Sequence, residues 1–375
     1  MHTVLHTIDT TGPGGAETVF IELATRLPVD RYRPIVVIRG EGWVCDELRR
    51  RGIEPVFMHN KGSFNLRYLA ALVDLVYRER IDLIQSHLLG SNVYCSLAGL
   101  IARRPVVATF HGTVDFEKKN RLTWAKYRTI NAGADRVIAV SEELRNAILE
   151  RTLIKPAKIQ VIYNGIRTAD YQRPHSAELR NRYGWYGNEV IIGSLGNIRP
   201  AKGYHILLHA AAILKQENSR LRFVIAGQGK GELFDELLHL RDRLGLEEQV
   251  KFLGFCDDAA GFLSNLDLFL SSSISEGLPL SAIQAMVAEL PVIATRCGGY
   301  EELITHAENG WLVEVGSPHA IAEGIGILTR DQELRMALAR RARGHALGRY
   351  DIRTMLGAYD RIYNSHLNRK PSRFG

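Results

Sequence analysis

Residues 271–299, SSSISEGLPLSAIQAMVAELPVIATRCGG, decide the fold because they hold a strand end, a loop, a helix, a second strand and a glycine turn in that order. The apolar run that precedes them, Leu266–Leu270, is typical of a buried strand. Pro279 suits a first helical turn, where its missing N–H would have had no partner. Pro291 ends the helix before a second apolar run. The stretch therefore predicts a β-α-β unit.

The polar residues of this stretch fall where a parallel sheet binds ligands. Glu276 and Gly277 lie at the start of the predicted helix, and Gly298 and Gly299 follow the second strand. Ligands of open α/β sheets bind outside the carboxyl ends of the strands, and a helix N-terminus there favours phosphate. A carboxylate, a helix N-terminus and a glycine turn are thus expected to converge at one edge of a sheet.

Strand-like and helical runs alternate along almost the whole chain, which is typical of βα units and a parallel sheet. At 375 residues the chain exceeds the usual size of a single core, so about two domains are expected. We predict an α/β protein with two Rossmann-like, doubly wound parallel-sheet domains that face a cleft, joined by a connector at Arg167–Gly187. The predicted strands are residues 4–8, 35–38, 55–58, 83–85, 106–110, 137–140, 159–162, 190–195, 221–226, 250–253, 266–270, 292–294 and 311–313.

Composition is that of an ordinary globular protein, with a net charge of +7. Residues 1–170 carry most of the excess, 24 Lys and Arg against 18 Asp and Glu, which favours anionic partners without identifying one. The four cysteines show no CxxC pair or zinc spacing and are typical of reduced cytosolic thiols. No signal peptide and no apolar run near the ~20 residues of a membrane span are present. A cytoplasmic location is expected.

The opening stretch resembles the signature of family 4 of the retaining glycosyltransferases, E-G-x-x-x-x-x-x-E followed by A-M-A-x-G-x-P-V-[IV]-A-[ST]-x-x-G-G. The matching residues are Glu276-Gly277, Ala285-Met286, Pro291–Thr295 and Gly298-Gly299. The resemblance implies the GT-B fold, with an acceptor-side domain at residues 1–168 and a nucleotide-sugar domain at residues 169–355. It also implies that the last helix, residues 356–375, crosses back onto the first domain.

The same resemblance implies the site residues. Lys202-Gly203 matches the family's K-G, whose lysine holds the donor diphosphate, and a fixed cation there stabilises the charge of the leaving group. Glu276 matches the glutamate that contacts the donor sugar. The expected catalytic residues are His111, Glu276, Lys202 and Arg199, and the expected donor-binding residues are Gly14, Gly15, Asn197, Gly227, Gly277, Leu278, Pro279, Leu280, Gln284, Gly298, Gly299 and Glu302.

Two of these positions depart from the family pattern. Gln284 replaces the second glutamate, which accepts hydrogen bonds from both ribose hydroxyls; an amide offers one acceptor and an NH₂ donor instead. Asn197 stands where the family has its arginine, and Arg199 lies two residues on. Either Arg199 reaches the phosphates from the neighbouring position, or one positive contact is lost. We expect weakened or redistributed ribose binding rather than an inactive enzyme.

In the first half, two motifs match the family. Gly14-Gly15-Ala16-Glu17 matches its G-G-[AI]-E, which favours contact with a ligand over a turn that only caps the helix. His111 falls in its [ST]-x-H-[GD] motif, whose histidine faces the sugar. A single histidine at a strand end is more often structural, but the motif favours a role in orienting the donor sugar or the acceptor. A near-neutral pKa would also permit proton transfer, which the sequence does not show.

The resemblance implies transfer of a sugar, with retention, from a nucleotide diphosphate sugar to a hydroxyl of a glycan or lipid-linked saccharide, in cell-surface polysaccharide or glycolipid synthesis. No metal motif stands out, so Lys202 and Arg199 are expected to take the place of a metal; no cofactor and no nucleic acid partner is expected. Front-face displacement is the expected route, and Glu276 as a covalent nucleophile is the alternative.

Residues Asp115–Ile130, DFEKKNRLTWAKYRTI, mix basic and aromatic side chains. A helix of this kind can lie on an anionic membrane surface, although an ordinary amphipathic surface helix has the same composition. Peripheral contact with the inner face of the membrane is therefore an open expectation.

Three alternatives to a transferase differ in class. A nucleotide-sugar epimerase of the same fold needs no acceptor. A degenerate relative would bind nucleotide sugars without turnover, and Gln284 and Asn197 keep this possibility open. An NAD-dependent oxidoreductase is disfavoured because the third glycine of the dinucleotide fingerprint is Glu17 and because Arg39, not an acid, follows the second strand.

Overall fold

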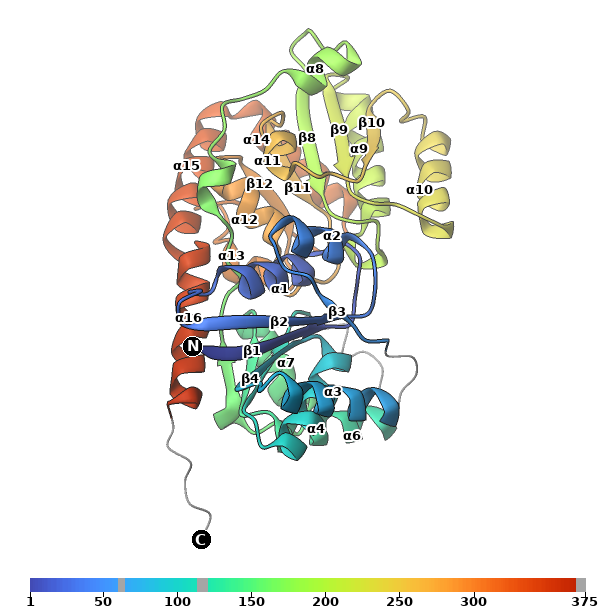
Figure 1. Cartoon of the computed structure of the whole chain (residues 1–375). Coiled ribbons are helices and arrows are strands. Elements are labelled where there is room, and N and C mark those ends of the chain that lie inside the picture. Colours follow the sequence, from blue (N-terminus) through green and yellow to red (C-terminus); the bar gives the residue numbers. More distant parts are fainter. Residues whose placement is uncertain (60–64, 113–120, 369–375) are drawn as a thin grey trace. The chain divides into compact units, whose positions relative to one another are not determined.

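The structure, a computed structural model, describes residues 1–59, 65–112 and 121–368. The chain divides into two compact units, each built on one parallel sheet (Figure 1). Unit 1 comprises Met1–Asn164 together with Arg353–Gly375, and unit 2 comprises Gly165–Ile352. Unit 2 is one continuous piece of chain, whereas unit 1 is completed by the C-terminal segment.

Seven parallel strands form the sheet of unit 1 in the order β3-β2-β1-β4-β5-β6-β7. The chain moves outward from β1 to β3 and then returns to pair β4 with the other side of β1. This reversal makes the carboxyl ends of β1 and β4 the switch point of the sheet. The strands are β1 (His2–Ile8), β2 (Tyr32–Ile38), β3 (Val56–Phe57), β4 (Leu83–His87), β5 (Val106–Phe110), β6 (Arg136–Ala139) and β7 (Ile159–Val161).

Helices lie on both faces of this sheet, as the right-handed crossovers between parallel strands require (Figure 1). On one face α1 (Gly15–Arg26) packs against α2 (Trp43–Arg50). On the other, α4 (Leu89–Ala102) contacts both α3 (Leu66–Arg78) and α6 (Arg121–Gly133). The remaining helix between strands is α7 (Glu142–Arg151), which begins at the side-chain cap of Ser141.

The C-terminal helix α16 (Ile352–Leu367) completes unit 1. Its tyrosines are fully buried, and Tyr359 shares a hydrogen bond of 3.1 Å with Thr109 of β5. Its Asp360 accepts a hydrogen bond from Tyr32 of β2 at 2.8 Å. The last helix of the chain thus supplies buried contacts to strands near the start of it.

Unit 2 repeats the same topology with six parallel strands in the order β10-β9-β8-β11-β12-β13. Its switch point lies between β8 and β11, which pair directly. The strands are β8 (Val190–Leu195), β9 (Leu221–Ala226), β10 (Val250–Gly254), β11 (Leu268–Ser271), β12 (Val292–Thr295) and β13 (Trp311–Val313).

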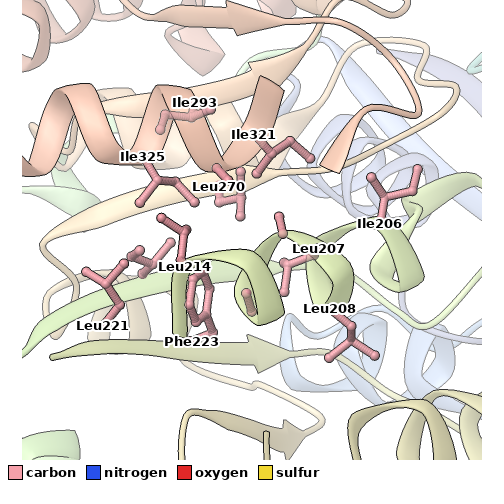
Figure 2. Close-up of a cluster of buried hydrophobic side chains, with 14 of the residues drawn as sticks. Ile206, Leu207, Leu208, Leu214, Leu221, Phe223, Leu270, Ile293, Ile321 and Ile325 are labelled. Atoms are coloured by element: carbon pink, nitrogen blue, oxygen red, sulfur yellow. The ribbon is translucent and has the colours of Figure 1, made fainter. Parts of the chain in front are cut away.

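The core of unit 2 lies between its sheet and two long helices. Figure 2 shows side chains of α9 (Tyr204–Glu217) and α14 (Pro318–Arg330) meeting those of β9, β11 and β12. Both helices are largely apolar on the face that packs, and α14 begins at the capping side chain of Ser317. The other helices are α8 (Glu178–Tyr183), α10 (Glu232–Arg243), α11 (Ala259–Leu263), α12 (Leu280–Val287), α13 (Tyr300–Leu303) and α15 (Gln332–Arg349).

All thirteen predicted strands are present, and the two sheets confirm the predicted α/β class. The segment expected to be a connector, Arg167–Gly187, instead belongs to unit 2 and contains the 3₁₀ helix η2 (Thr168–Tyr171) and α8. Its composition, rich in turn-forming residues, did not indicate that η2 packs against α11 and α12. Within the described residues, no helix is long and apolar enough to cross a membrane.

Candidate active site

The candidate site in unit 2 is built from the loops that leave the two strands at its switch point. β8 ends at Leu195 and leads through the 3₁₀ helix η3 (Pro200–Lys202) into α9. β11 ends at Ser271 and leads through Glu276 into α12. The loops touch directly, since Ile274 N donates to Ala201 O at 2.7 Å. The sheet therefore brings Lys202 and Glu276 together although 74 residues separate them.

Lys202 and Glu276 form an ion pair in this site. Lys202 Nζ lies 2.7 Å from Glu276 Oε1, and both side chains are largely buried, with exposed fractions of 21% and 14%. Ser273 Oγ donates to the same oxygen at 2.7 Å. Both hydrogen bonds fall on Oε1, so within the described residues Oε2 remains for a ligand. An ammonium group has three donors, so Lys202 retains two for an anion.

Glycines allow the loops to close around this pair. Gly298 has φ +57°, and a Cβ there would lie 1.9 Å from the carbonyl oxygen of Glu276. Gly299 is similarly tight, because a Cβ would lie 2.3 Å from Gly277 O. The glycine turn after β12 thus packs against the backbone of Glu276-Gly277, and a side chain at Gly298 is excluded both by backbone conformation and by space.

The N-terminus of α12 follows Glu276 and Gly277 along the chain and belongs to the same loop region. Pro279 is the N-cap residue, one position before the first helical turn in which it was predicted, and no side chain caps the helix. Leu278 and Leu280 are buried and hold this end of the helix in place. The unpaired N–H groups and the helix dipole favour an anion here.

Gln284 lies on α12 and its amide already has a partner. Nε2 donates to the hydroxyl of Tyr171 at 2.7 Å, so the amide carbonyl is the end left for a ligand. Tyr171 comes from η2, in the segment predicted to be a connector. The orientation agrees with the expectation that Gln284 offers one acceptor where a glutamate would offer two oxygens.

Asn197 holds the loops in place with its side chain. Its Oδ1 accepts from the backbone N–H of Gln228 at 2.9 Å, while the N–H of Ile198 donates to Gln228 O. These bonds join the loop after β8 to the turn at Gly227, where a Cβ would lie 2.0 Å from Gly196 O. Arg199 is exposed at the start of η3. Glu302 lies in the first turn of α13.

The remaining predicted residues belong to unit 1. Gly14 is the N-cap of α1 and Gly15 its first residue, at the carboxyl end of β1. Glu17, in the first turn, is buried and accepts a hydrogen bond from Thr10 Oγ1 at 2.7 Å. A Cβ at Gly14 would collide with this carboxylate. The glycines thus make room for a buried Glu17 in the turn between β1 and α1.

His111 follows β5 and pairs with a second histidine that the sequence did not single out. Its Nε2 lies 2.8 Å from Nδ1 of His87, the last residue of β4. Burial lowers the pKa of His111 to about 3, and the pKa of His87 also falls well below its ordinary value. Both imidazoles are therefore neutral at physiological pH, so His111 does not act as a proton donor of ordinary histidine acidity.

Sequence reasoning did not single out His87 or Tyr171, whose side chains contact His111 and Gln284. The predicted strand at residues 83–85 ends two residues before His87, and Tyr171 lies in the segment predicted to be a connector. Of the basic segment Asp115–Ile130, residues 115–120 lie outside the described part. In α6, Trp124 is exposed with Arg128 4.6 Å from its ring, whereas Tyr127 is buried in the core.

This arrangement suits a ligand with a diphosphate and several hydroxyls. Lys202 and a helix end without a side-chain cap are groups that favour an anion, and the carboxylate of Glu276 can accept hydrogen bonds from hydroxyl groups. Among the described residues, no group of three or more His, Cys, Asp or Glu side chains is arranged to hold a metal ion.

Comparison with known proteins identifies the family. The model for Glycosyltransferase Family 4 matches residues 13–170, and that for Glycosyl transferases group 1 matches residues 175–345. The chain is 30% identical over 311 residues to N-acetyl-alpha-D-glucosaminyl L-malate synthase of Bacillus anthracis. This alignment covers 80% of this chain and 79% of that protein. It is 23% identical over 332 residues to the UDP-Gal:alpha-D-GlcNAc-diphosphoundecaprenol alpha-1,3-galactosyltransferase of Escherichia coli, covering 85% and 86%.

Among solved structures, Anabaena Alr3699/HepE in complex with UDP-glucose has a TM-score of 0.89 and 28% sequence identity, covering 97% of this chain and 100% of that one. The superposed part of the two chains therefore includes the strands of both sheets. The chain therefore belongs to glycosyltransferase family 4, and it is a glycosyltransferase with the GT-B fold.

Proposed function

We propose that the protein transfers a sugar from a uridine diphosphate sugar to a hydroxyl of a glycan or lipid-linked saccharide, with retention of anomeric configuration. The observation that carries this proposal is the contact between Lys202 and Glu276, 2.7 Å apart at the switch point of unit 2. It puts a phosphate-binding cation next to an acceptor for sugar hydroxyls. The cell process we propose is synthesis of cell-surface polysaccharide or glycolipid.

Lys202 and α12 would hold the leaving diphosphate. The lysine keeps two N–H donors after its contact with Glu276, and the uncapped helix amides add neutral donors that need no proton transfer. Negative charge grows on the diphosphate as the sugar leaves, so these groups stabilise the transition state more than the ground state. Arg199, exposed next to this loop, is the further cation that we propose for the phosphates.

Glu276 and Gln284 would orient the sugar and the ribose. Oε2 of Glu276 is the oxygen left for sugar hydroxyls, and the carbonyl of Gln284 is the acceptor left for one ribose hydroxyl. Since Ser273 and Lys202 both bind Oε1, these two contacts hold the Glu276 side chain in one orientation. We propose an orienting role for it and no covalent intermediate.

Two similar proteins support the choice of donor and acceptor. The solved Anabaena structure contains UDP-glucose, and the name of the Escherichia coli relative specifies UDP-Gal and a diphosphoundecaprenol acceptor. The cytoplasmic location and the peripheral contact with anionic membrane predicted from the sequence are part of this proposal. Exposed Trp124 of α6, with Arg128 against its ring, is the described part of that surface.

The function is tested first by donor binding and then by transfer. UDP, GDP and ADP with their sugars are compared by thermal shift, and we expect a shift with the uridine series alone. The preferred sugar nucleotide is then incubated with polyprenol-linked saccharides, and the product's anomeric coupling is read by NMR. An inverted anomeric centre would contradict retention, and conversion of the sugar nucleotide without any acceptor would establish an epimerase instead.

The membrane proposal has its own test. Sedimentation with phosphatidylglycerol vesicles at low salt should carry the protein down, and a Trp124→Ala/Arg128→Ala variant should sediment less. Neutral phosphatidylcholine vesicles are the control. Equal sedimentation with both lipids, or none with either, would refute the contact.

A further inference from the structure

A chain of buried hydrogen bonds in unit 1 leads from the C-terminal helix to His111. Tyr363 of α16 donates its hydroxyl to Gln85 Oε1 at 3.0 Å. The other end of that amide, Nε2, lies 3.1 Å from His87 Nε2. His87 Nδ1 in turn lies 2.8 Å from His111 Nε2. Tyr363, Gln85 and His87 are fully buried, so water does not compete for these contacts.

The direction of this chain is set by the orientation of the Gln85 amide. Its Nε2 faces two other oxygens, the carbonyl of Ser86 at 3.2 Å and the hydroxyl of Thr109 at 2.9 Å. A carbonyl oxygen can only accept, so the nitrogen of the amide must be the end that faces it. The hydroxyl of Tyr363 on the opposite end agrees with this choice, because it can donate to the amide oxygen.

The amide orientation fixes the tautomer of His87. An amide nitrogen does not accept hydrogen bonds, so a proton on His87 Nε2 would point at a donor. His87 Nε2 must therefore be the unprotonated nitrogen of the ring. The proton of the neutral imidazole lies on Nδ1, which is the nitrogen that faces His111.

The geometry of the two rings transmits this choice to His111. The ring planes differ by 20°, and the centroids are 5.1 Å apart with 2.8 Å between the facing nitrogens. The rings therefore lie edge to edge, as an N–H···N bond requires, and are not stacked face to face. His111 Nε2 accepts, so its own proton lies on Nδ1. Among the described residues, this buried Nδ1 has no hydrogen-bond partner.

We infer that Gln85 and His87 are positioning residues that hold His111 as the Nδ1–H tautomer, so that it offers a single N–H donor to an oxygen atom of the substrate. The assignment of that oxygen to a sugar rests on the proposed function, whereas the tautomer does not. An imidazole without such a partner would populate both tautomers and would face the substrate with an acceptor part of the time. Tyr363 extends the control of this donor to the C-terminal helix.

The tautomer can be observed directly in the intact protein without substrate. Long-range ¹H–¹⁵N correlation on protein labelled at its 13 histidines distinguishes protonated from unprotonated ring nitrogens. His87→Gln and His111→Gln variants assign the two residues by the loss of their signals. We expect His87 and His111 both to carry the proton on Nδ1. A proton on Nε2 of His111 in the wild-type protein would overturn the inference.

A Gln85→Glu variant tests the origin of the tautomer. The carboxylate has the same shape but can only accept, so at pH 9 a proton must appear on Nε2 of His87. Tyr32→Phe, which removes a buried hydroxyl that bonds Asp360 of α16 and not Gln85 or its partners, should leave both histidines as in the wild type. If His87 keeps its proton on Nδ1 alone in Gln85→Glu, Gln85 does not set the tautomer. If that variant does not fold, Gln85→Met replaces it, and a wild-type spectrum there would equally overturn the inference.

Transfer assays separate this inference from the proposed function. In Gln85→Glu we expect kcat to fall at least tenfold with the affinity for UDP unchanged, because the residue lies outside unit 2. The expected histidine spectra with no transferase activity in the wild type would leave the tautomer established and refute the proposed function. Normal transferase activity together with a proton on Nε2 of His111 would support the proposed function and overturn the inference about the tautomer.

Discussion

Lys202 is the residue on which the proposed chemistry depends most. Replacing it by methionine keeps much of the aliphatic stem and removes the charge that faces the leaving diphosphate. We expect kcat to fall by about 10²- to 10³-fold, the usual effect of removing one preorganised donor from a transition state. Steady-state transfer from the sugar nucleotide measures this directly.

A lysine at the opposite end of α9 provides the control for Lys202→Met. Lys215 lies in the last turn of that helix, and its ammonium contacts the carbonyl of Gly245. Lys215→Met changes the net charge equally and should leave kcat within about twofold, since an exposed charge on the surface acts weakly at a distance. A similar loss in both variants would show that Lys202 acts through overall charge.

Gln284 should tolerate restoration of the glutamate. In Gln284→Glu, Tyr171 can donate its hydroxyl to the carboxylate, so the contact across to η2 survives while both oxygens become acceptors. Charge-assisted hydrogen bonds are roughly twice as strong as neutral ones, so the affinity for UDP should stay equal or rise. Isothermal titration with UDP measures it, and Gln284→Met, which has no acceptor, should bind more weakly than both. A large loss of affinity in Gln284→Glu would contradict this account.

At the scale of single residues, sequence reasoning identifies side chains and not their partners. The spacing of the family motif leads to Lys202 and Glu276, but the sequence does not show that Ser273 shares the same carboxylate oxygen. It places Asn197 among the donor-binding residues, and the structure shows its carbonyl holding the backbone of Gln228. Such contacts depend on loop geometry, which a pattern of residue types does not encode.

Among the elements, the turn after β12 is the least tolerant of change. Gly298→Ala places a Cβ 1.9 Å from Glu276 O at a φ of +57°, so the turn must move. We expect a loss of about 2 kcal/mol or more in the free energy of unfolding, and weaker UDP binding because Glu276 moves with the turn. Urea denaturation of the protein with and without UDP measures both effects.

A glycine within α15 provides the matched control. At Gly344 a new Cβ would meet nothing within 4 Å, and the residue lies in a helix. Gly344→Ala should therefore stabilise the protein by about 0.5–1 kcal/mol, because alanine favours the helix. The same substitution is thus expected to lower the free energy of unfolding at Gly298 and to raise it at Gly344. Equal destabilisation by both would show that the backbone conformation of Gly298 is not what matters.

The central strands were predictable from the sequence because they are buried on both faces, whereas both residues of β3 are exposed. A parallel strand covered by helices on both sides becomes a continuous apolar run, such as Val106–Phe110, and such runs are conspicuous. Segments whose packing depends on a few contacts were harder: η2 lies in a stretch rich in turn-forming residues, and its role appears only through Tyr171. Prediction failed where a polar contact decides the structure.

On the scale of the whole molecule, unit 1 should be the more acid-sensitive half. Burial lowers the pKa of His6, His87 and His111 in the native state, while an unfolded histidine has a pKa near ~6.5. Below that value the unfolded chain binds protons that the native chain does not. The contribution of these histidines to the free energy of unfolding is thus fully present above about pH 6.5. It is lost as the pH falls, by up to about 1.4 kcal/mol per pH unit for each histidine.

Denaturation in urea at pH 8 and pH 5.5 checks this prediction, with a hydrogen-exchange pulse at one common pH and mass spectrometry to report each unit separately. Buried Asp9 acts in the opposite direction, because its raised pKa favours the native state as the pH falls. His6→Gln should reduce the pH dependence of unit 1, and replacement of exposed His239 should not. If unit 2 lost more unfolding free energy than unit 1 between pH 8 and pH 5.5, unit 1 would not be the more acid-sensitive half.

Ribosomal synthesis imposes an order on this molecule. The segment that completes unit 1, α16, is made after the rest of unit 2, which is continuous and ends at Ile352. Domains usually fold in the order in which they are made. Here the later unit can finish first, while the first 164 residues wait with the positions for Tyr359 and Tyr363 unfilled. A nascent chain from which unit 2 has emerged but α16 has not would therefore carry a folded unit 2 and a unit 1 still accessible to chaperones.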